Sequence, residues 1–295
     1  MEQRYERIRQ IRDREELRQS FDGLAGRVFG LSFENWYREG FWSERYIPYV
    51  MAEGNRVLSC AAANRMDFEL DGERKRLVQI GTVMTDPAHR NRGLASRLIE
   101  GIVEEWKGSC DGIYLFANDK ALDFYPRFGF RRETETRLTR PAGAGRSCRG
   151  DFEKLDMDLP ECRKLVLDRY RLPHPYAALS MRENEGLLMF YCAGVLKDCV
   201  YYSGSLDLVC VAWQEGDTLF CDDLFGSCRR PLHGALDAVE GIGNRISRIV
   251  LGFTPQDAGG FGEEAVGDDD ALFFYGSRKT PFAGRPLRFP ALSHA

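Results

Sequence analysis

The chain has 295 residues, of which 43% are hydrophobic and 29% charged, with 30 Gly and 12 Pro. This balance is typical of a folded globular protein and excludes a disordered or collagen-like chain. At roughly 150 residues per domain, the length predicts two domains. The 41 basic and 45 acidic side chains give a net charge of −4, which argues against a general nucleic-acid-binding protein, because phosphate backbones are held by clustered Lys and Arg.

Signals for export or membrane insertion are missing from the sequence. No apolar run approaches the ~18 residues that a membrane span needs, and the opening Met-Glu-Gln-Arg-Tyr-Glu-Arg is too charged for a signal peptide. The nine cysteines include no C-x-x-C pair, so we expect free thiols packed in the core rather than disulfides or a zinc site. We therefore expect a cytoplasmic protein that acts without a membrane, as a monomer or an oligomer.

The first half predicts an α+β unit. In chain order we expect a strand, helices over 12–29 and 32–37, strands over 46–51, 56–68 and 74–85, a helix over 91–107, a strand over 112–117, a further helix and a final strand. The strand over 74–85, the helix and the strand over 112–117 predict a βαβ unit with parallel strands. A phosphate would bind where the first of these strands joins the helix.

The second half predicts elements in a similar order. We expect a helix over 160–171, strands over 187–193, 198–203, 207–213 and 217–222, a helix over 231–240, strands over 247–253 and 271–275, and a surface loop over 259–270. The order favours a degenerate duplicate of the first unit, with a generic α+β domain as the alternative. We place the domains at 1–140 and 159–295, and 141–158 is a linker or includes a closing strand of the first domain over 152–157.

The segment from Arg90 to Ser96 has the features of an anion site. A helix N-terminus leaves about four N–H groups without partners and carries roughly half a positive charge. Gly93 and Ala95 leave room for a pyrophosphate, while Arg90 and Arg92 add donors. The first 150 residues carry 26 basic and 23 acidic side chains, against 15 and 22 in the rest, which also favours a polyphosphate in the first half. The alternative is an exposed basic loop before a surface helix.

Other catalytic and nucleotide-binding motifs are absent. The sequence contains no G-x-x-x-x-G-K-[S/T], G-x-G-x-x-G, H-E-x-x-H or G-x-S-x-G motif, and it has only four His. These absences argue against an ATPase, a dehydrogenase, a metalloprotease or a serine hydrolase. We expect no metal.

Two motifs in the first half resemble those of the GNAT superfamily of N-acetyltransferases. Arg90-x-x-Gly93-x-Ala95, placed after a strand and Asp86-Pro87, is similar to that family's R/Q-x-x-G-x-G/A pyrophosphate motif. About 25 residues later, Asn118 to Phe130 is similar to its N-x-x-A-x-x-F-Y-x-x-x-G-F pattern. The resemblance covers roughly residues 1–140. It implies a mixed, mainly antiparallel sheet with flanking helices, followed here by a second GNAT-like α/β domain.

The resemblance also implies an acetyl-CoA site and a catalytic acid. The backbone of the strand end would pair with the pantetheine arm and the acetyl carbonyl, the loop and helix start would hold the pyrophosphate, and two further residues would lie near the pantetheine. These positions are Val83, Met84, Thr85, Arg90, Asn91, Arg92, Gly93, Leu94, Ala95, Ser96, Asn118 and Ala121. Tyr125 matches the tyrosine that protonates the departing thiolate in many members. A phenol of ordinary pKa is protonated at neutral pH and can serve this role, although an aromatic residue there could also simply pack the core.

No general base is evident. The strand over 77–85 lacks the glutamate that some members carry, and the nearby candidates are Asp67, Glu69, Asp86 and His89. Because some tandem GNAT acetyltransferases bring the C-terminal carboxylate into the active site, Ala295 is a candidate by resemblance, with a loose or docked terminus as the alternative.

The acceptor cannot be identified from the sequence, and two regions bear on it. Trp36, Tyr37, Phe41 and Trp42 lie where GNAT proteins usually bind the acceptor, although core packing would use the same residues. The second half does not repeat the phosphate motif, since in Leu224–His233 the glycine precedes the arginines and Pro231 removes a donor. We expect this half to shape the acceptor pocket, and its acidity would suit a cationic amine.

These observations predict an acetyl-CoA-dependent N-acetyltransferase that transfers the acetyl group directly to a primary amine of a small molecule or peptide. The alternative is a non-catalytic acyl-CoA-binding or sensing protein with the same fold. An acyl-CoA longer than acetyl-CoA would fit the same motifs.

Overall fold

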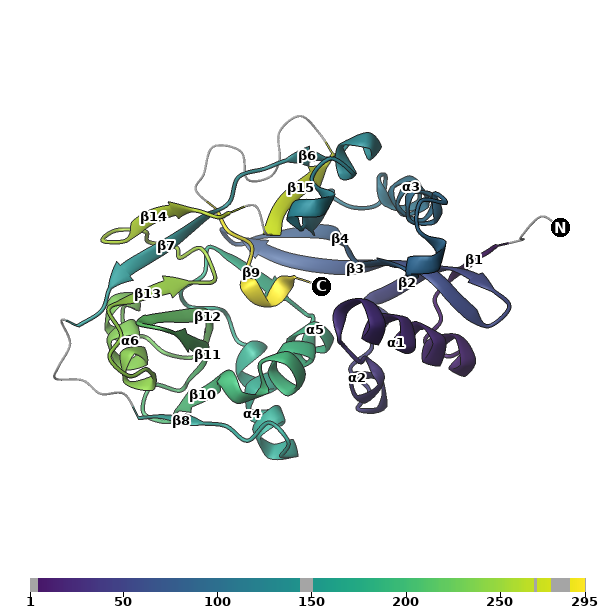
Figure 1. The fold of residues 1–295 in the computed structure, drawn as a ribbon. Helices are drawn as coiled ribbons and strands as arrows, with labels where there is room; N and C mark the ends of the chain where they lie inside the picture. The colour runs from purple at the N-terminus through teal and green to yellow at the C-terminus, as the bar shows by residue number, and fades with distance from the viewer. Residues whose placement is uncertain (1–4, 144–150, 268–269, 277–286, 295) are drawn as a thin grey trace.

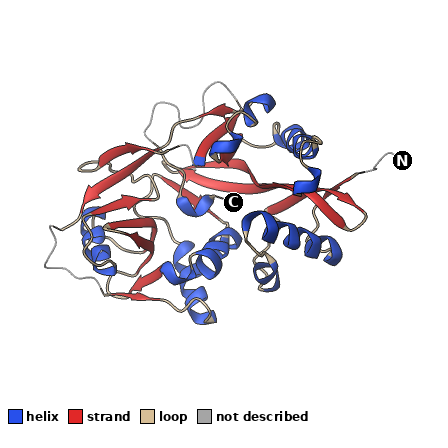
Figure 2. Cartoon of the chain, in the orientation of Figure 1, coloured by secondary structure: helices blue, strands red, loops and turns tan. Residues whose placement is uncertain are grey.

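Two mixed β-sheets with flanking helices form the molecule (Figures 1 and 2). The computed structural model describes residues 5–143, 151–267, 270–276 and 287–294. In these ranges no helix has the length and apolarity to cross a membrane. The architecture is the predicted α+β class with a second unit of the same kind.

The first sheet has the strand order β1-β2-β3-β4-β5-β15-β6, and β9 pairs with the end of β3. Its strands are β1 (Glu6–Arg9), β2 (Tyr46–Glu53), β3 (Arg56–Leu70), β4 (Glu73–Thr85), β5 (Gly112–Ala117), β6 (Arg131–Arg132), β9 (Leu179–Arg182) and β15 (Ala271–Tyr275). Only β4 and β5 run parallel, which confirms the predicted βαβ unit.

The second sheet has the order β14-β7-β13-β12-β11-β10-β8. Its strands are β7 (Thr136–Pro141), β8 (Phe152–Lys154), β10 (Val200–Ser203), β11 (Leu208–Glu215), β12 (Thr218–Gly226), β13 (Arg248–Leu251) and β14 (Gly262–Ala265). Only β12 and β13 are parallel, so they occupy the position that β4 and β5 hold in the first sheet.

The two sheets exchange strands at matching positions. In the first sheet β15, from the second half of the chain, lies between β5 and β6. In the second sheet β7, from the first half, lies at the matching position between β13 and β14. The division at 141–158 thus stays a prediction, and the sheets do not follow it strictly.

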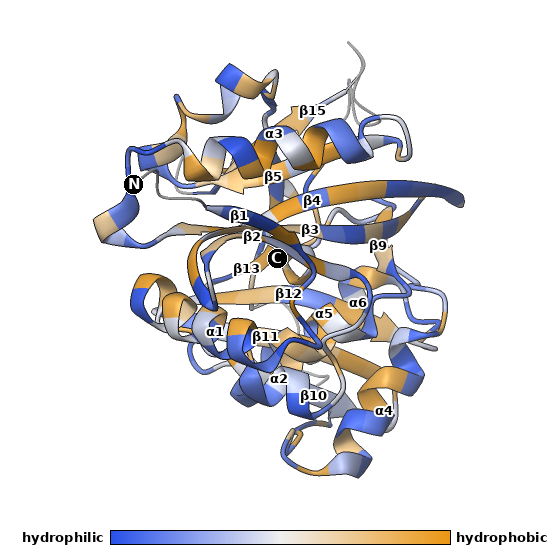
Figure 3. Ribbon diagram, turned by 90° about the vertical axis from the view of Figure 1, so that its right-hand side faces the viewer, coloured by the Kyte–Doolittle hydropathy of each residue, from blue (hydrophilic) through white to orange (hydrophobic). Residues whose placement is uncertain are grey.

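The α-helices of the described residues are α1 (Glu15–Phe29), α2 (Glu34–Arg38), α3 (Leu94–Trp106), α4 (Pro160–Tyr170), α5 (Glu185–Phe190) and α6 (Leu232–Val239). Some of these helices cover both faces of the first sheet (Figure 3). α3 buries a stripe containing Leu98, Ile99 and Ile102 against one face, as its helical spacing predicts. α1 buries Leu17 and Phe21 against the other face, and each such side chain contributes roughly 1.5–3 kcal/mol.

Two of the predicted elements have the wrong secondary structure. The run over 187–193 was expected as a strand, but it lies in α5 and the π-helical turn Tyr191–Val195. A short apolar run cannot be assigned by periodicity alone, and here the Asn184 side chain accepts a hydrogen bond from the Leu187 N–H at 3.3 Å and caps the helix. The helix expected after β5 is instead two 3₁₀ turns, Asp119–Ala121 and Tyr125–Phe128.

Two further predictions, for the segments 152–157 and 259–270, are also corrected by the structure. The strand considered over 152–157 does not close the first domain, because β8 pairs with β10 of the second sheet. The expected loop over 259–270 contains β14, whose sequence Gly-Glu-Glu-Ala gives no apolar signal. The cysteines follow the prediction more closely: eight described cysteines are free thiols, and five of them are buried.

Candidate active site

The parallel strands β4 and β5 separate part-way along their length. They are paired only from Leu77–Gly112 to Gln79–Tyr114, although β4 continues to Thr85 and β5 to Ala117. Beyond the last pair, the backbone of β4 has no partner strand on its β5 side. An extended ligand can add hydrogen bonds to such an edge in the manner of an additional strand.

A β-bulge lies at the point where β4 leaves β5. Gly81 pairs with Ala62 and Met84 with Cys60, so two residues of β4 oppose one residue of β3. Thr82, in this bulge, has a φ of 49°, a left-handed conformation that is unfavourable for a β-branched residue. A β-bulge bends its strand and changes the direction in which side chains point. This bulge lies just beyond the last residue pair of β4 and β5.

A cavity of about 330 Å³ occupies the opening between the strands and extends under α2 and α5. Its lining comes from both halves of the chain: Phe29, Leu31, Phe33, Trp36, Ser43, Arg45, Tyr46, Asn64, Gln79, Ile80, Gly81, Thr82, Val83, Phe116, Asn118, Ala121, Tyr125, Asn184, Leu187, Phe190, Tyr191, Asp270 and His294. Among these described residues, only Arg45 and Asp270 carry a permanent formal charge near neutral pH. The cavity is therefore mainly aromatic and aliphatic.

The loop between β4 and α3 is the segment that the sequence predicts to bind an anion. Asn91 and Gly93 have positive φ values of 60° and 71°, and Gly93 is the N-cap of α3. A Cβ added at Gly93 would meet no atom within 4 Å, so the space before the helix is open. The first N–H groups of α3 have no partners within the helix and are available to an anion there.

The predicted donor-site residues fall into three groups. Val83, Asn118 and Ala121 line the cavity. Met84 and Leu94 bury their side chains in the core, so only their backbone groups could bind a ligand. The others lie at the end of β4, on the turn and at the helix start: Thr85, Arg90, Asn91, Arg92, Gly93, Ala95 and Ser96.

Arg92 also helps to hold the loop in place. Its guanidinium donates to the Tyr5 hydroxyl at 2.9 Å and to the Ala88 carbonyl at 3.3 Å. Replacing Arg92 would therefore disturb the loop as well as its charge.

Tyr125 lies in the wall of the cavity and is only 5% exposed. It packs against Phe124, Phe130 and Phe273, so part of its role is to hold the turn onto the sheet. Burial raises the pKa of Tyr125 to about 12. The hydroxyl is therefore protonated throughout the neutral range and can donate a proton but not accept one.

None of the four carboxylate and histidine candidates for a base lines the cavity. Glu69 pairs with Arg182 at 3.9 Å. Asp86 accepts from the Ala88 N–H at 3.0 Å and caps the following 3₁₀ turn, and His89 lies 3.6 Å from it. Asp67 is part of an ion-pair network described next.

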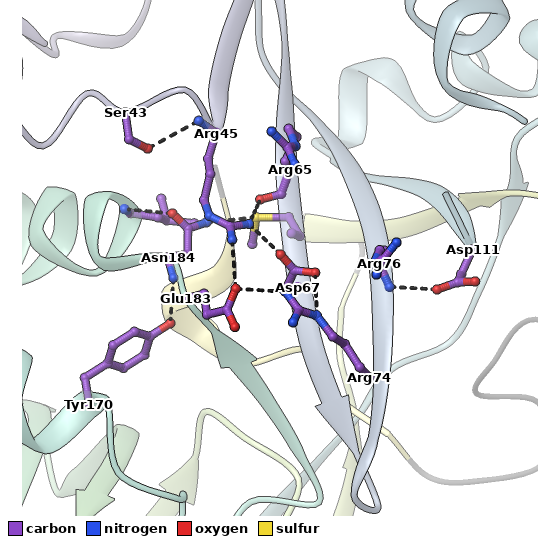
Figure 4. Close-up of polar contacts among 12 residues, drawn as sticks. Ser43, Arg45, Arg65, Asp67, Arg74, Arg76, Asp111, Tyr170, Glu183 and Asn184 are labelled. Atoms are coloured by element: carbon purple, nitrogen blue, oxygen red, sulfur yellow. Dashed lines mark hydrogen bonds and ion pairs between the residues drawn. The ribbon is translucent and has the colours of Figure 1, made fainter. Parts of the chain in front are cut away.

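Figure 4 shows that network, which joins the first sheet to the segment before α5. The Arg45 guanidinium lies 2.6 Å from the Asp67 carboxylate, which also pairs with Arg74 at 3.1 Å, and both arginines reach Glu183. Burial opposes ionisation of Asp67, but hydrogen bonds from Arg74 and Arg45 lower its pKa overall. Asp67 is thus a poor base, and Arg45 enters the cavity wall with its charge already paired.

The wall residues that were not identified from the sequence include Phe190, Tyr191, Asp270 and His294. They come from the second half and reach the cavity through tertiary packing, so no local spacing marks them. Of the aromatic residues that the sequence placed near the acceptor, Trp36 lines the cavity, whereas Tyr37, Phe41 and Trp42 pack behind it. Ala295 lies outside the described residues.

Among the described residues, the second sheet has no comparable opening. β12 and β13 also separate, after Cys221 and Leu251, but the Gly252 carbonyl accepts from the Ala291 N–H at 2.8 Å. A Cβ added at Gly252 would collide with the Asp222 backbone and the Ala291 side chain. The segment around Ala291 therefore fills the position that is open in the first sheet. Within the described ranges, no three His, Cys, Asp or Glu side chains form a metal site.

Comparisons with known proteins agree with this geometry. Residues 9–130 match the acetyltransferase (GNAT) family, a span that includes β4, α3, β5 and Tyr125. No curated protein matches the chain.

Solved structures show the same two-unit fold. A probable N-acyltransferase from Enterococcus faecalis V583 is 13% identical with a TM-score of 0.59, and the match covers 92% of this chain and 71% of that one. A GCN5-related N-acetyltransferase from Kribbella flavida is 18% identical with a TM-score of 0.56, covering 91% and 71%. Eis1 from Mycobacterium abscessus is 17% identical with a TM-score of 0.53, covering 91% and 72%. At these identities the similarity establishes the fold.

Proposed function

Because residues 9–130 form a domain of the GNAT acetyltransferase family, we propose that this protein is an acetyl-CoA-dependent N-acetyltransferase acting on a primary amine. The observation that carries the proposal is the opening between β4 and β5, which leads from the N-terminus of α3 to a cavity with Tyr125 in its wall. A long thioester with an anionic end and an apolar, reactive end fits this arrangement.

The residues present suit acetyl-CoA. The pyrophosphate would bind the first N–H groups of α3 beside Gly93, with Arg90 nearby to supply charge. The pantetheine arm would pair with the free edge of β4 at Val83 and Thr85 and pass Asn118. The acetyl group would then lie in the cavity beyond Thr82.

The reaction would proceed by direct transfer. The neutral amine attacks the thioester carbonyl carbon, a C–N bond forms, and the C–S bond breaks as the tetrahedral intermediate collapses. Tyr125 would donate its hydroxyl proton to the departing sulfur, which its raised pKa permits because the hydroxyl is protonated at neutral pH. A cysteine intermediate is not needed, and burial raises the pKa of Cys60 well above the range in which a thiolate forms.

The cavity lining favours an amine carried on an apolar body. Phe33, Trp36, Tyr46 and Phe190 form one wall, with ring centroids 5.4–5.8 Å apart for four of their pairs. Such rings bind apolar and aromatic groups through area and edge-to-face contacts. Most acidic residues of the second half lie away from the cavity, because Asp270 is the only carboxylate among its described lining residues. The cavity therefore suits a polycationic acceptor less well than an apolar amine.

Calorimetric titration of acetyl-CoA, together with a thiol-release assay over a panel of amines, tests the proposal. The panel should include arylalkylamines, alkylamines, polyamines and amino acids. We expect binding, and thiol release that is fastest with the arylalkylamines and alkylamines. Binding without turnover of any amine would instead support the acyl-CoA-sensing alternative.

A matched pair of variants locates the donor site. Gly93→Asp places a negative charge at the N-terminus of α3, whereas Gly93→Asn adds a side chain of the same size without charge, and both residues tolerate the left-handed conformation. We expect Gly93→Asp to lose acetyl-CoA affinity by at least tenfold relative to Gly93→Asn. Equal affinity of the two variants would mean that the phosphates bind elsewhere.

A further inference from the structure

The segment 287–294 runs between the two sheets (Figure 1), and its last residue, His294, lines the cavity. The Thr136 N–H donates to the Leu287 carbonyl at 3.1 Å, and the Phe289 N–H donates to the buried Glu135 carboxylate at 2.7 Å. The Ala291 N–H donates to Gly252 in the second sheet. Held by hydrogen bonds to β7, to Glu135 and to the residue after β13, the segment places the His294 side chain in the cavity wall.

The His294 ring is held by contacts on three sides. It lies parallel to the Phe116 ring, with centroids 3.6 Å apart and an interplanar angle of 12°. Its Nδ1 is 2.9 Å from an oxygen of Asp270, and its backbone carbonyl accepts a hydrogen bond from the Tyr191 hydroxyl. Phe116, Asp270 and Tyr191 all line the same cavity.

These contacts determine which ring nitrogen is free. A carboxylate acceptor at Nδ1 favours the tautomer that carries its proton there, which leaves a lone pair on Nε2. Nε2 is buried and has no hydrogen-bond partner among the described residues. Leaving a polar atom buried without a partner is costly, and a hydrogen-bonding group of a ligand that reaches Nε2 from the cavity would remove that cost.

The proposed reaction needs a group with this property. The nitrogen of the attacking neutral amine must lose one proton as the C–N bond forms, and none of Asp67, Glu69, Asp86 and His89 lines the cavity. We propose that His294, positioned by Asp270, is the general base for the acceptor amine, an inference that rests on the proposed function. The proton leaves the amine nitrogen for Nε2 as the C–N bond forms, and the resulting imidazolium is stabilised by Asp270.

Other charged groups surround His294. Glu135, which precedes β7, and Asp222, in the bulge of β12, both interact electrostatically with it, and Arg288 lies on its own segment and near both carboxylates. Burial raises the pKa of Glu135, and it raises that of Asp222 to about 6. Together with Asp270, these groups favour the positive charge that His294 acquires, while Arg288 opposes it.

The test compares His294→Gln and Asp270→Asn with wild type, using the amine turned over fastest. The control is His233→Gln, because the His233 imidazole also stacks on a phenylalanine, Phe261, at 4.6 Å but lies outside the cavity lining. The measurements are the acetyl-CoA affinity, the pH profile of kcat/KM, and the activity of His294→Ala with and without added imidazole.

We expect His294→Gln to lower kcat/KM at neutral pH by roughly a hundredfold, with acetyl-CoA affinity within about twofold of wild type. The fall in kcat/KM at acidic pH that wild type shows should be absent in His294→Gln. Added imidazole should partly restore the activity of His294→Ala. Asp270→Asn should show a smaller loss and a displaced acidic limb.

The outcomes separate the inference from the function it rests on. If His294→Gln turns over the amine as fast as wild type, and its kcat/KM still falls at acidic pH, the role of His294 is overturned and the acetyltransferase proposal stands. Acetyl-CoA binding without turnover by wild type would overturn both. Loss of acetyl-CoA binding in both His294→Gln and Asp270→Asn would assign the pair to donor binding and overturn the base assignment.

Discussion

The Tyr46 hydroxyl donates a hydrogen bond to Thr82 Oγ1 at 2.9 Å. Tyr46 is buried on β2, and Thr82 is the bulge residue of β4 with positive φ. The contact therefore ties a strained backbone position to a rigid core side chain. Strained positions persist only where their surroundings hold them, so we expect this bond to maintain the opening between β4 and β5.

Tyr46→Phe should weaken donor binding more than it slows chemistry. It removes the bond to Thr82, and we expect KM for acetyl-CoA to rise several-fold, kcat to change little, and the free energy of unfolding to fall by about 1 kcal/mol. Steady-state kinetics and denaturant unfolding measure these effects. Thr82→Ser retains the hydroxyl and is the matched control; an equal rise in KM in that variant would contradict the role of the bond.

Tyr125→Phe should slow turnover while leaving acetyl-CoA affinity nearly unchanged. Loss of the proton donor should lower kcat by roughly ten- to a hundredfold, measured as thiol release. Because burial raises the pKa of Tyr125 to about 12, the hydroxyl is neutral below that pH and should add no basic limb to the profile between pH 8 and 10. Tyr201→Phe, on β10, is the control, and a similar loss there would remove the case for Tyr125.

Gly186→Ala should destabilise the contact between α2 and α5. The Gly186 carbonyl accepts a hydrogen bond from Trp36 Nε1 at 2.6 Å, and a Cβ at Gly186 would collide with the Phe41 carbonyl oxygen. We expect the free energy of unfolding to fall by about 1–3 kcal/mol, measured by denaturant titration. Gly194→Ala is the control because its added Cβ meets no atom within 4 Å; destabilisation of equal size in both variants would contradict the clash.

Asp223→Asn should stabilise the protein at alkaline pH. Burial raises the pKa of Asp223 to about 7, with a smaller contribution from Asp222, while its oxygen accepts from the Leu224 N–H at 2.8 Å. When folding raises the pKa of a carboxyl group, the group's contribution to the free energy of unfolding is fully present only below its pKa in the unfolded chain. That contribution is lost as pH rises through the folded-state pKa, here about 7. At about 1.4 kcal/mol for each pKa unit, the variant should gain roughly 2–4 kcal/mol at pH 8.

Unfolding of Asp223→Asn and wild type at pH 8 and pH 5 measures that effect. The gain should shrink as pH falls, because wild-type Asp223 becomes protonated in the folded state. Asp198→Asn is the control, since Asp198 is an exposed carboxylate 2.7 Å from Lys154 and should show no gain at pH 8. A gain of the same size at both pH values would contradict the assigned pKa.

The parts of the candidate site that could be predicted from the sequence are those formed by residues close together in the chain. The strand, turn and helix around Gly93 and the turn containing Tyr125 follow from residues close together in the chain, and the structure places them at one opening. Asp270 and His294 escaped prediction because they meet Phe116 only through tertiary packing. The strand exchange escaped it for the same reason: the apolar run of β15 predicts a strand but not the sheet that it joins.

The strand exchange also sets the order in which the molecule can be completed during synthesis. β15 lies between β5 and β6 in the first sheet, yet about 150 residues separate it from β5 in the chain. At 5–20 residues per second, a ribosome finishes β5 roughly 8–30 s before it finishes β15. During that interval the edge of β5 that faces β15 has no partner strand, so the first sheet can be completed only after the second half has been synthesised.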